Sequence, residues 1–167
     1  VYAGAGGELQ VGTQGRSIYG GLEQFTGDDS VEFVTETARE NAITQLTADD
    51  APRGVMPVVF APGGNGVLFH EACGHGMEAD LIERGSAFAG KMGEPVASEL
   101  VTLRDDGTIP HAPGSFGVDD EGVPAQNTAL IRDGILENYL HSLVTAQRAG
   151  VEPTGSGRRE TYRHPPI

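Results

Sequence analysis

Two stretches of the chain repeat apolar residues at every third or fourth position, which predicts amphipathic helices. In residues 29–47, Asp28, Asp29 and Ser30 offer N-caps before the repeat, and Glu32 follows Asp29 in capping-box spacing. In residues 67–84 the repeat ends just before Gly85, a typical helix stop. The repeating residues are Val31, Val34, Ala38, Ala42 and Leu46 in the first stretch, and Leu68, Ala72, Ala79 and Ile82 in the second.

Short apolar runs bounded by turn residues predict strands. Glycines divide residues 8–25 into short strands with turns or bulges, and residues 55–61 form a strand in which Pro57 favours a sheet edge because it lacks an N–H donor. Residues 96–103 form a further strand that closes at Asp105-Asp106-Gly107. The strongest signal is a hairpin in which residues 128–132 and 135–140 pair across Asp133-Gly134.

Together these elements predict an α+β fold, and we expect residues 1–167 to form a single partial domain of a larger protein. A short helix over residues 142–149 ends at a glycine, and residues 151–167 show no periodicity. Helices 29–47 and 67–84 are expected to cover a mixed or antiparallel sheet. Its strands are those around Leu9, Val58, Val101, Ile131 and Leu136.

Charge and cysteine content narrow the classes of function. The 167 residues carry 11 Lys+Arg against 24 Asp+Glu, a net charge of −13, which argues against nucleic acid or an anionic membrane as the main partner. The longest apolar run, around residues 55–61, is far shorter than the roughly 18 residues that a membrane helix needs. The single cysteine, Cys73, cannot build a disulfide framework, so we expect a protein of the reducing cytoplasm.

Two imidazoles and a carboxylate lie close together in the segment His70-Glu71-Ala72-Cys73-Gly74-His75. Imidazole nitrogen is a natural zinc ligand, and a glutamate beside a ligand can take a proton from zinc-activated water. The five-residue separation of the histidines places them about 140° apart on a regular helix, too far round to share one ion. A metal site therefore predicts a local widening such as a π-bulge, which Gly74 and Gly76 would permit.

Other residues offer competing chemistry. Cys73, flanked by the two histidines, could act as a thiol nucleophile, but cysteine more often fills a small core gap, and we favour packing. The segment Asp119-Asp120-Glu121-Gly122 lacks the ligand spacing of a calcium loop and is interpreted as a turn with solvated carboxylates. Isolated histidines are expected to have surface or locally hydrogen-bonded roles, although any of them could complete a metal site. They are His111, His141 and His164.

The segment His70-Glu71-Ala72-Cys73-Gly74-His75-Gly76-Met77-Glu78-Ala79-Asp80 resembles the H-E-x-x-x-H signature of the TldD/PmbA metallopeptidases, also called the modulator-of-gyrase family. Further blocks resemble family segments in the same order and extend the resemblance over most of the chain. They are Val96-Ala97-Ser98-Glu99, Asp105-Asp106-Gly107-Thr108, Asp119-Asp120-Glu121-Gly122, Asp133-Gly134-Ile135-Leu136 and Pro153-Thr154-Gly155-Ser156-Gly157-Arg158-Arg159-Glu160.

The resemblance implies a cytoplasmic zinc peptidase that hydrolyses unfolded peptides or peptide precursors in an enclosed cavity. His70 and His75 match the zinc ligands and Glu71 matches the general base. The third protein ligand of the family is a cysteine in a C-terminal β-rich region, which we expect outside this chain, as is the family's N-terminal domain. Cys73 does not correspond to that ligand.

The resemblance also implies a partner, either a related subunit of the TldE/PmbA type that lacks the H-E-x-x-x-H motif or a second copy of the chain. The segment Gly155-Ser156-Gly157-Arg158-Arg159 is expected to shape the cavity or hold a substrate carboxylate, and the alternative is that its arginines tie a loop to acidic neighbours. The rival function is a non-catalytic acidic assembly or binding module that keeps the helix motif as scaffolding. Metal content distinguishes it from a peptidase.

Overall fold

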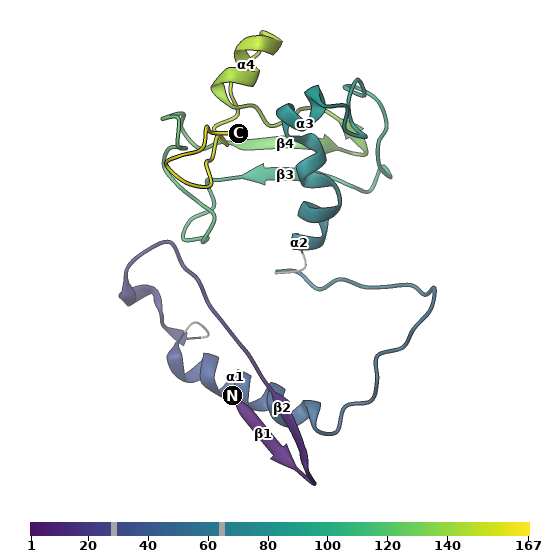
Figure 1. Ribbon diagram of the computed structural model, residues 1–167, viewed down its shortest axis with the longest axis vertical. Coiled ribbons are helices and arrows are strands. Elements are labelled where there is room, and N and C mark those ends of the chain that lie inside the picture. The colour runs from purple at the N-terminus through teal and green to yellow at the C-terminus, as the bar shows by residue number, and fades with distance from the viewer. Residues whose placement is uncertain (28–29, 64–65) are drawn as a thin grey trace. The chain divides into compact units, whose positions relative to one another are not determined.

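The computed structural model describes residues 1–27, 30–63 and 66–167, which fold into two compact units. The first comprises Val1–Val58 with His111–Pro113, and the second comprises Val59–Pro110 with Gly114–Ile167. Both combine helices with small antiparallel sheets, so the fold is α+β as predicted (Figure 1). Among the described residues, no helix is long and apolar enough to span a membrane.

The first unit packs one helix against a two-stranded ribbon. Strand β1 (Tyr2–Ala5) pairs antiparallel with β2 (Glu8–Val11), and helix α1 (Val31–Gln45) buries Ala38 and Ala42. A Cβ atom at Gly12, just after β2, would lie 1.9 Å from the Ala38 carbonyl oxygen, so only glycine allows this close approach. The short 3₁₀ helix η1 (Leu22–Gln24) lies between β2 and α1.

Ser30 is the observed N-cap of α1, because its hydroxyl accepts a hydrogen bond from the Phe33 amide at 3.1 Å. This confirms the predicted helix and one of its proposed caps. Asp28 and Asp29, the other proposed caps, lie outside the described residues.

Two strand predictions for this part of the chain are wrong. Within residues 8–25 only Glu8–Val11 forms a strand, while Tyr2–Ala5, not predicted, supplies its partner. Residues 55–61 belong to the described chain yet form neither helix nor strand, and Val55 and Val59 are almost fully exposed. Pro57 removes a ladder donor there, and among the described strands none pairs with this segment, so its apolar content alone does not produce a strand.

The second unit contains an antiparallel sheet in the order β3-β4-β5, formed by β3 (Leu103–Asp106), β4 (Asn127–Arg132) and β5 (Ile135–Leu136). The hairpin predicted at Asp133-Gly134 is confirmed, with φ of +48° and +81° at the two residues, the signs that a type I′ turn requires. A Cβ atom at Gly134 would lie 2.6 Å from the Ala97 carbonyl oxygen.

Strand boundaries and sheet membership differ from the prediction. β3 begins at Leu103, where the predicted strand 96–103 ends, and β5 stops at Leu136 rather than at residue 140. The strand around Leu9 belongs to a separate sheet from the strands around Ile131 and Leu136. The expected single sheet is therefore replaced by two small ones, and the segment around Val58 belongs to neither.

A helical stretch packs against this second sheet through a small apolar core. The stretch consists of α2 (Gly66–Phe69), the π turn η3 (His70–Gly74), the 3₁₀ turn η4 (His75–Met77) and α3 (Ala79–Glu83). Met77 and Leu136 are fully buried, and each such side chain contributes roughly 1.5–3 kcal/mol through burial. Leu130 and Ile131 complete the core, which thus fixes the helical stretch relative to β4 and β5.

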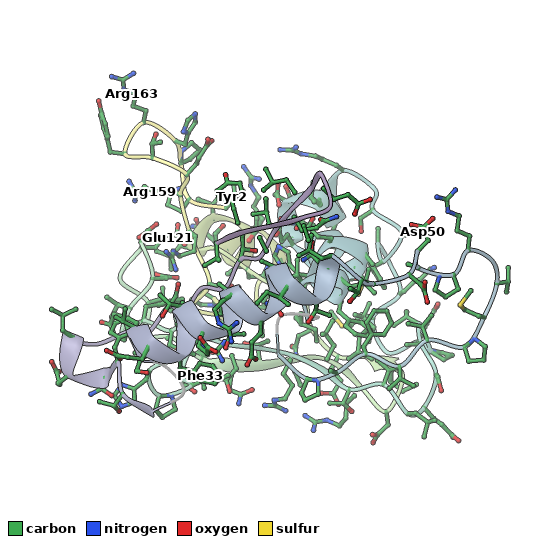
Figure 2. All side chains as sticks on the ribbon, turned by 90° about the horizontal axis from the view of Figure 1, so that it is seen from below. Tyr2, Phe33, Asp50, Glu121, Arg159 and Arg163 are labelled. Atoms are coloured by element: carbon green, nitrogen blue, oxygen red, sulfur yellow. The ribbon has the colours of Figure 1, made fainter. Side chains whose placement is uncertain are left out.

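The last helix is α4 (Leu143–Ala149), which confirms the helix predicted over residues 142–149. The Ser142 hydroxyl caps its N-terminus by accepting from the Thr145 amide, and Gly150 ends it. The remaining residues, 151–167, form no helix or strand, although every one of them lies in the described chain. Figure 2 shows Arg159 and Arg163 on this segment, both with exposed side chains.

Candidate metal centre

The helix that carries the two histidines is interrupted at the motif itself. Residues His70–Gly74 form a π turn, and the His75 amide donates to the His70 carbonyl oxygen five residues back. One additional residue is accommodated in this turn, so the two imidazoles lie on the same side of the helix. The local widening predicted from the five-residue spacing is confirmed.

Gly74 ends the π turn, and Gly76 lies in the 3₁₀ turn that follows. Gly74 has ordinary right-handed helical angles of φ −55° and ψ −56°, so the π turn does not use its additional conformational freedom. Gly76 packs closely against Phe88, because a Cβ atom there would lie 3.0 Å from the Phe88 ring. The turn at Gly74 thus needs no backbone angles reserved for glycine, and the role of the two glycines in permitting the bulge stays a prediction.

The three motif side chains converge on one exposed site. The ring centroids of His70 and His75 lie 4.3 Å apart in an edge-to-face arrangement. One ligand atom from each of His70, Glu71 and His75 falls within 4.8 Å of the other two, close enough for one metal ion. The Nε2 atom of His75 is 4.0 Å from a Glu71 carboxylate oxygen. Two imidazoles and an adjacent carboxylate form a donor set that fits zinc.

Glu78 is a site residue for which the sequence analysis assigned no role. Its carboxylate oxygen Oε1 lies 2.7 Å from the Nδ1 atom of His75, on the other edge of the ring from Glu71. The signal was present in the sequence, because residues three apart on a helix are neighbours and Glu78 follows His75 by three positions.

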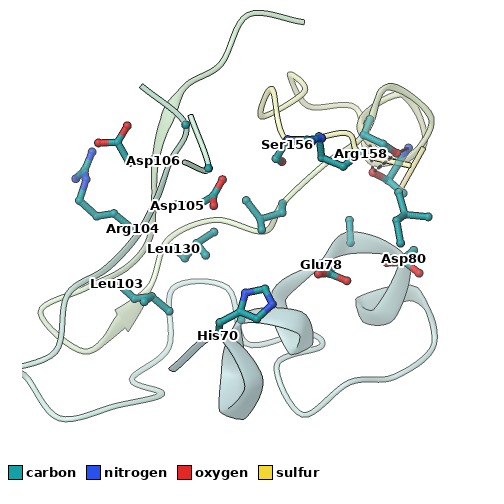
Figure 3. A pocket seen from close by; sticks show the side chains of 18 of the residues that line it. His70, Glu78, Asp80, Leu103, Arg104, Asp105, Asp106, Leu130, Ser156 and Arg158 are labelled. Atoms are coloured by element: carbon teal, nitrogen blue, oxygen red, sulfur yellow. Dashed lines mark hydrogen bonds between the residues drawn. The ribbon is translucent and has the colours of Figure 1, made fainter. Parts of the chain in front are cut away.

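A cavity of about 630 Å³ opens beside the motif within the second unit. Figure 3 shows His70 and Glu78 on its helical side, Asp105 on β3, and Ser156 and Arg158 on the C-terminal segment. The volume suits a few residues of a peptide or a small molecule. Of the three motif residues, His70 is the one that lines the cavity.

Asp105 is a partly buried carboxylate in this cavity and was singled out by sequence only as a strand end. Burial raises the pKa of Asp105, and the neighbouring Asp106 raises it further, while His70 opposes both effects. Its side chain has no hydrogen-bond or salt-bridge partner among the described residues. The change from apolar to acidic residues at the end of an apolar run is the sequence signal that could have identified it.

The C-terminal segment lines the cavity and also binds an acidic turn, as two of the sequence-based interpretations expected. Binding of a substrate carboxylate by its arginines stays a prediction. Arg158 lies 3.7 Å from the Asp120 carboxylate and stacks over the Phe116 ring at 4.9 Å. The Arg159 amide donates to Asp120 at 2.9 Å. Arg158 and Arg159 also line the cavity, and their ties to Asp120 fix this wall.

The acidic turn at residues 119–122 differs from the prediction that its carboxylates are solvated. Asp119 is 6% exposed rather than solvated. Its Oδ1 atom accepts from the amides of Glu121 and Val123, and its Oδ2 atom accepts from the amide of Gly157, each at 2.9 Å. These bonds make Asp119 a structural anchor for the C-terminal segment.

The remaining candidates have the local roles expected of them. Cys73 packs against the core, donates its thiol hydrogen to the Phe69 carbonyl oxygen, and has its pKa raised by burial, all of which favour packing over nucleophilic chemistry. Each isolated histidine has a ring nitrogen near an oxygen atom, which is close in sequence for His141 and His164 but 92 residues away for His111. The pairs are His111 with Tyr19 O at 3.3 Å, His141 with Thr145 Oγ1 at 3.3 Å, and His164 with Thr161 Oγ1 at 3.0 Å.

Comparison with known proteins identifies the class. The PmbA/TldA metallopeptidase C-terminal domain matches residues 53–167, which include the π turn, the cavity and the acidic turn. The chain therefore belongs to the PmbA/TldA metallopeptidase family, as the sequence motifs indicated.

Individual relatives agree with this assignment. The chain is 45% identical to the metalloprotease TldD homolog of Haemophilus influenzae over 96% of its length, and 42% identical to a metalloprotease of Methanocaldococcus jannaschii over 95%. The crystal structure of TldE from Thermococcus kodakarensis matches 99% of the chain with a TM-score of 0.76 and 25% identity. The chain covers 37% of the TldE structure, 34% of the Haemophilus influenzae protein and 35% of the Methanocaldococcus jannaschii protein. It therefore spans about a third of the length of these relatives.

Proposed function

We propose that this chain contributes the metal-binding helix of a zinc-dependent peptidase. His70 and His75 hold the ion, and Glu71 is the general base. The observation that carries the proposal is the π turn, because it brings two imidazoles whose spacing is unsuitable on a regular helix together with the Glu71 carboxylate, one nitrogen or oxygen atom of each lying within 4.8 Å of the others. The relatives carry the name metalloprotease, which supports a bound metal in proteins of this family.

The chemistry of the site follows from the positions of these side chains. When bound, zinc supplies Lewis-acid activation of water and of the scissile carbonyl group. Glu71 accepts the proton of the attacking water and donates it to the leaving amine nitrogen, a role that requires a carboxylate beside the ligand His75. The cavity beside His70 receives the peptide, and its walls orient the scissile bond toward the helix.

A catalytic zinc site usually has three protein ligands and an open position. His70 and His75 supply two, and we assign the third to a cysteine outside residues 1–167, in line with the resemblance. The isolated chain should accordingly bind zinc weakly and show no robust hydrolysis. The full-length protein is the species in which activity is expected.

The substrate we propose is an unfolded peptide or peptide precursor. Strand β3 forms one edge of its sheet and lines the cavity, so an extended chain entering there has backbone groups available for pairing. The fold shared with TldE supports assembly with a related subunit or with a second copy of the chain. The single cysteine suits a reducing compartment, and we place the protein in the cytoplasm.

Metal analysis of variants of the full-length protein tests the proposal. Zinc should be present in the wild type and be lost from His70→Ala and His75→Ala. Glu71→Gln should keep the zinc and lower peptide hydrolysis by about 10²- to 10⁴-fold. His164→Ala, which changes a histidine outside the cluster, is the matched control and should keep its zinc. Equal zinc in the wild type and in both cluster variants would contradict the assignment.

A further inference from the structure

The two histidines of the metal cluster are held differently. His75 is fixed at one ring nitrogen, because Nδ1 lies 2.7 Å from Oε1 of Glu78. The ring of His70 makes no hydrogen bond among the described residues, and its edge-to-face contact is with His75. One ligand of the pair is thus oriented by a carboxylate and the other is not.

Glu78 itself is held firmly by its backbone. It has extended angles of φ −70° and ψ 131° and interrupts the helical stretch between η4 and α3. At this break it forms a parallel bridge with Leu140, and the hydrogen bonds Ala79 N to Leu140 O and Leu140 N to Met77 O, each 2.9 Å, flank it. Both neighbours in sequence, Met77 and Ala79, are buried. The carboxylate therefore projects from a fixed point.

The hydrogen bond to Glu78 determines which nitrogen of His75 is available. A neutral imidazole carries one N–H, and a carboxylate at Nδ1 stabilises the tautomer with the proton there. The other nitrogen, Nε2, then has a free lone pair, and it is this atom that faces the Glu71 carboxylate at 4.0 Å. Of the two ring nitrogens of His75, Nε2 is therefore the one left free to bind the ion of the proposed function.

We infer that Glu78 is a positioning residue, which fixes the Nδ1–H tautomer and the ring orientation of His75 so that Nε2 binds the metal. This inference rests on the proposed function for its purpose, while the tautomer itself is a property of the metal-free chain. Carboxylates that accept a hydrogen bond from a metal-binding histidine commonly change metal affinity by about 10- to 100-fold when they are replaced.

Nitrogen-15 NMR of histidine-labelled, metal-free protein at a pH where His75 is neutral measures the tautomer directly. In the wild type, His75 should carry its proton on Nδ1, and Glu78→Ala should shift the proton toward Nε2. Zinc affinity, measured by competition with a chelator, should fall about 10- to 100-fold in Glu78→Ala. Glu78→Gln keeps an oxygen acceptor of nearly the same shape, so it should retain the Nδ1–H tautomer and lose less affinity.

Glu83→Gln is the matched control, because it removes one negative charge at the end of α3, the helix that follows Glu78, from a residue that pairs with Arg148. It should leave both the tautomer and the zinc affinity unchanged. The inference is overturned if Glu78→Ala keeps the wild-type tautomer and affinity, or if the control changes them equally. A His75→Ala variant that keeps its zinc would instead refute the proposed function, while the tautomer measurement would still stand.

Discussion

Asp119 anchors the C-terminal wall of the cavity, and its replacement gives a graded test of that role. Asp119→Ala removes all three acceptor contacts, whereas Asp119→Asn keeps Oδ1 for Glu121 and Val123 but turns an NH₂ group toward the Gly157 amide. The asparagine variant thus detaches the C-terminal segment selectively. The alanine variant disrupts the turn as well.

The expected losses follow from these contacts. A hydrogen bond to a charged group contributes about 1.5–3 kcal/mol, and a buried donor left without a partner costs about 1–3 kcal/mol. Asp119→Asn, which loses one bond, should lower the free energy of unfolding by about 2 kcal/mol. Asp119→Ala leaves three amide donors without their acceptor. Because water can reach some of them through local opening, we expect the free energy of unfolding to fall by about 3–5 kcal/mol, at the upper end for single substitutions.

Urea unfolding followed by circular dichroism measures both losses, and hydrogen exchange of the Gly157 amide locates them. Exchange at Gly157 should accelerate in both variants. Glu152→Gln is the control, because Glu152 is an exposed residue of the same C-terminal segment and its replacement should change the free energy of unfolding by less than about 0.5 kcal/mol. An Asp119→Ala variant as stable as Glu152→Gln would refute the reasoning.

Three further predictions concern the core, the cavity and the thiol. Leu136→Ala should cost about 2–5 kcal/mol in urea unfolding because Leu136 is fully buried, whereas Leu100→Ala, at a 90% exposed residue, should stay within about 0.5 kcal/mol. Because burial raises the pKa of Asp105, the folded state keeps the carboxyl proton to higher pH than the unfolded state, and the free energy of unfolding of the wild type falls as pH rises through the folded pKa. Asp105→Asn should lack this pH-dependent loss and be more stable than the wild type at neutral pH. Because burial raises the pKa of Cys73, iodoacetamide should modify it more slowly in the native than in the urea-unfolded protein, as followed by mass spectrometry, and equal rates would contradict its packed position.

Features encoded by local chemistry were predictable from the sequence. The Asp133-Gly134 turn, the Ser30 cap and the distorted histidine helix each depend on a few adjacent residues whose geometry has few solutions. The π turn in particular followed from an angle, since two ligands about 140° apart cannot share an ion.

Features that depend on distant partners were not predictable in the same way. Residues 55–61 have the composition of a strand, but a strand needs a neighbour, and composition does not say whether one is present. From the sequence Asp119 resembles a surface turn residue, because its hydrogen bond with the Gly157 amide, 38 residues away, depends on the fold. Glu78 was visible beside His75, yet its fixed position depends on Leu140.

The π turn also governs how the motif tolerates insertion and deletion. In a regular helix, removing one residue rotates everything downstream by about 100°. Here the turn already holds one surplus residue, so a deletion between Glu71 and His75 can be absorbed by a return to α-helical bonding, with the flanking segments kept in phase. A five-residue histidine spacing in this chain is thus geometrically equivalent to a four-residue spacing with one additional residue held in the π turn. Zinc-binding helices that are compared by sequence spacing alone would be placed in different groups even where their ligands occupy the same helix face.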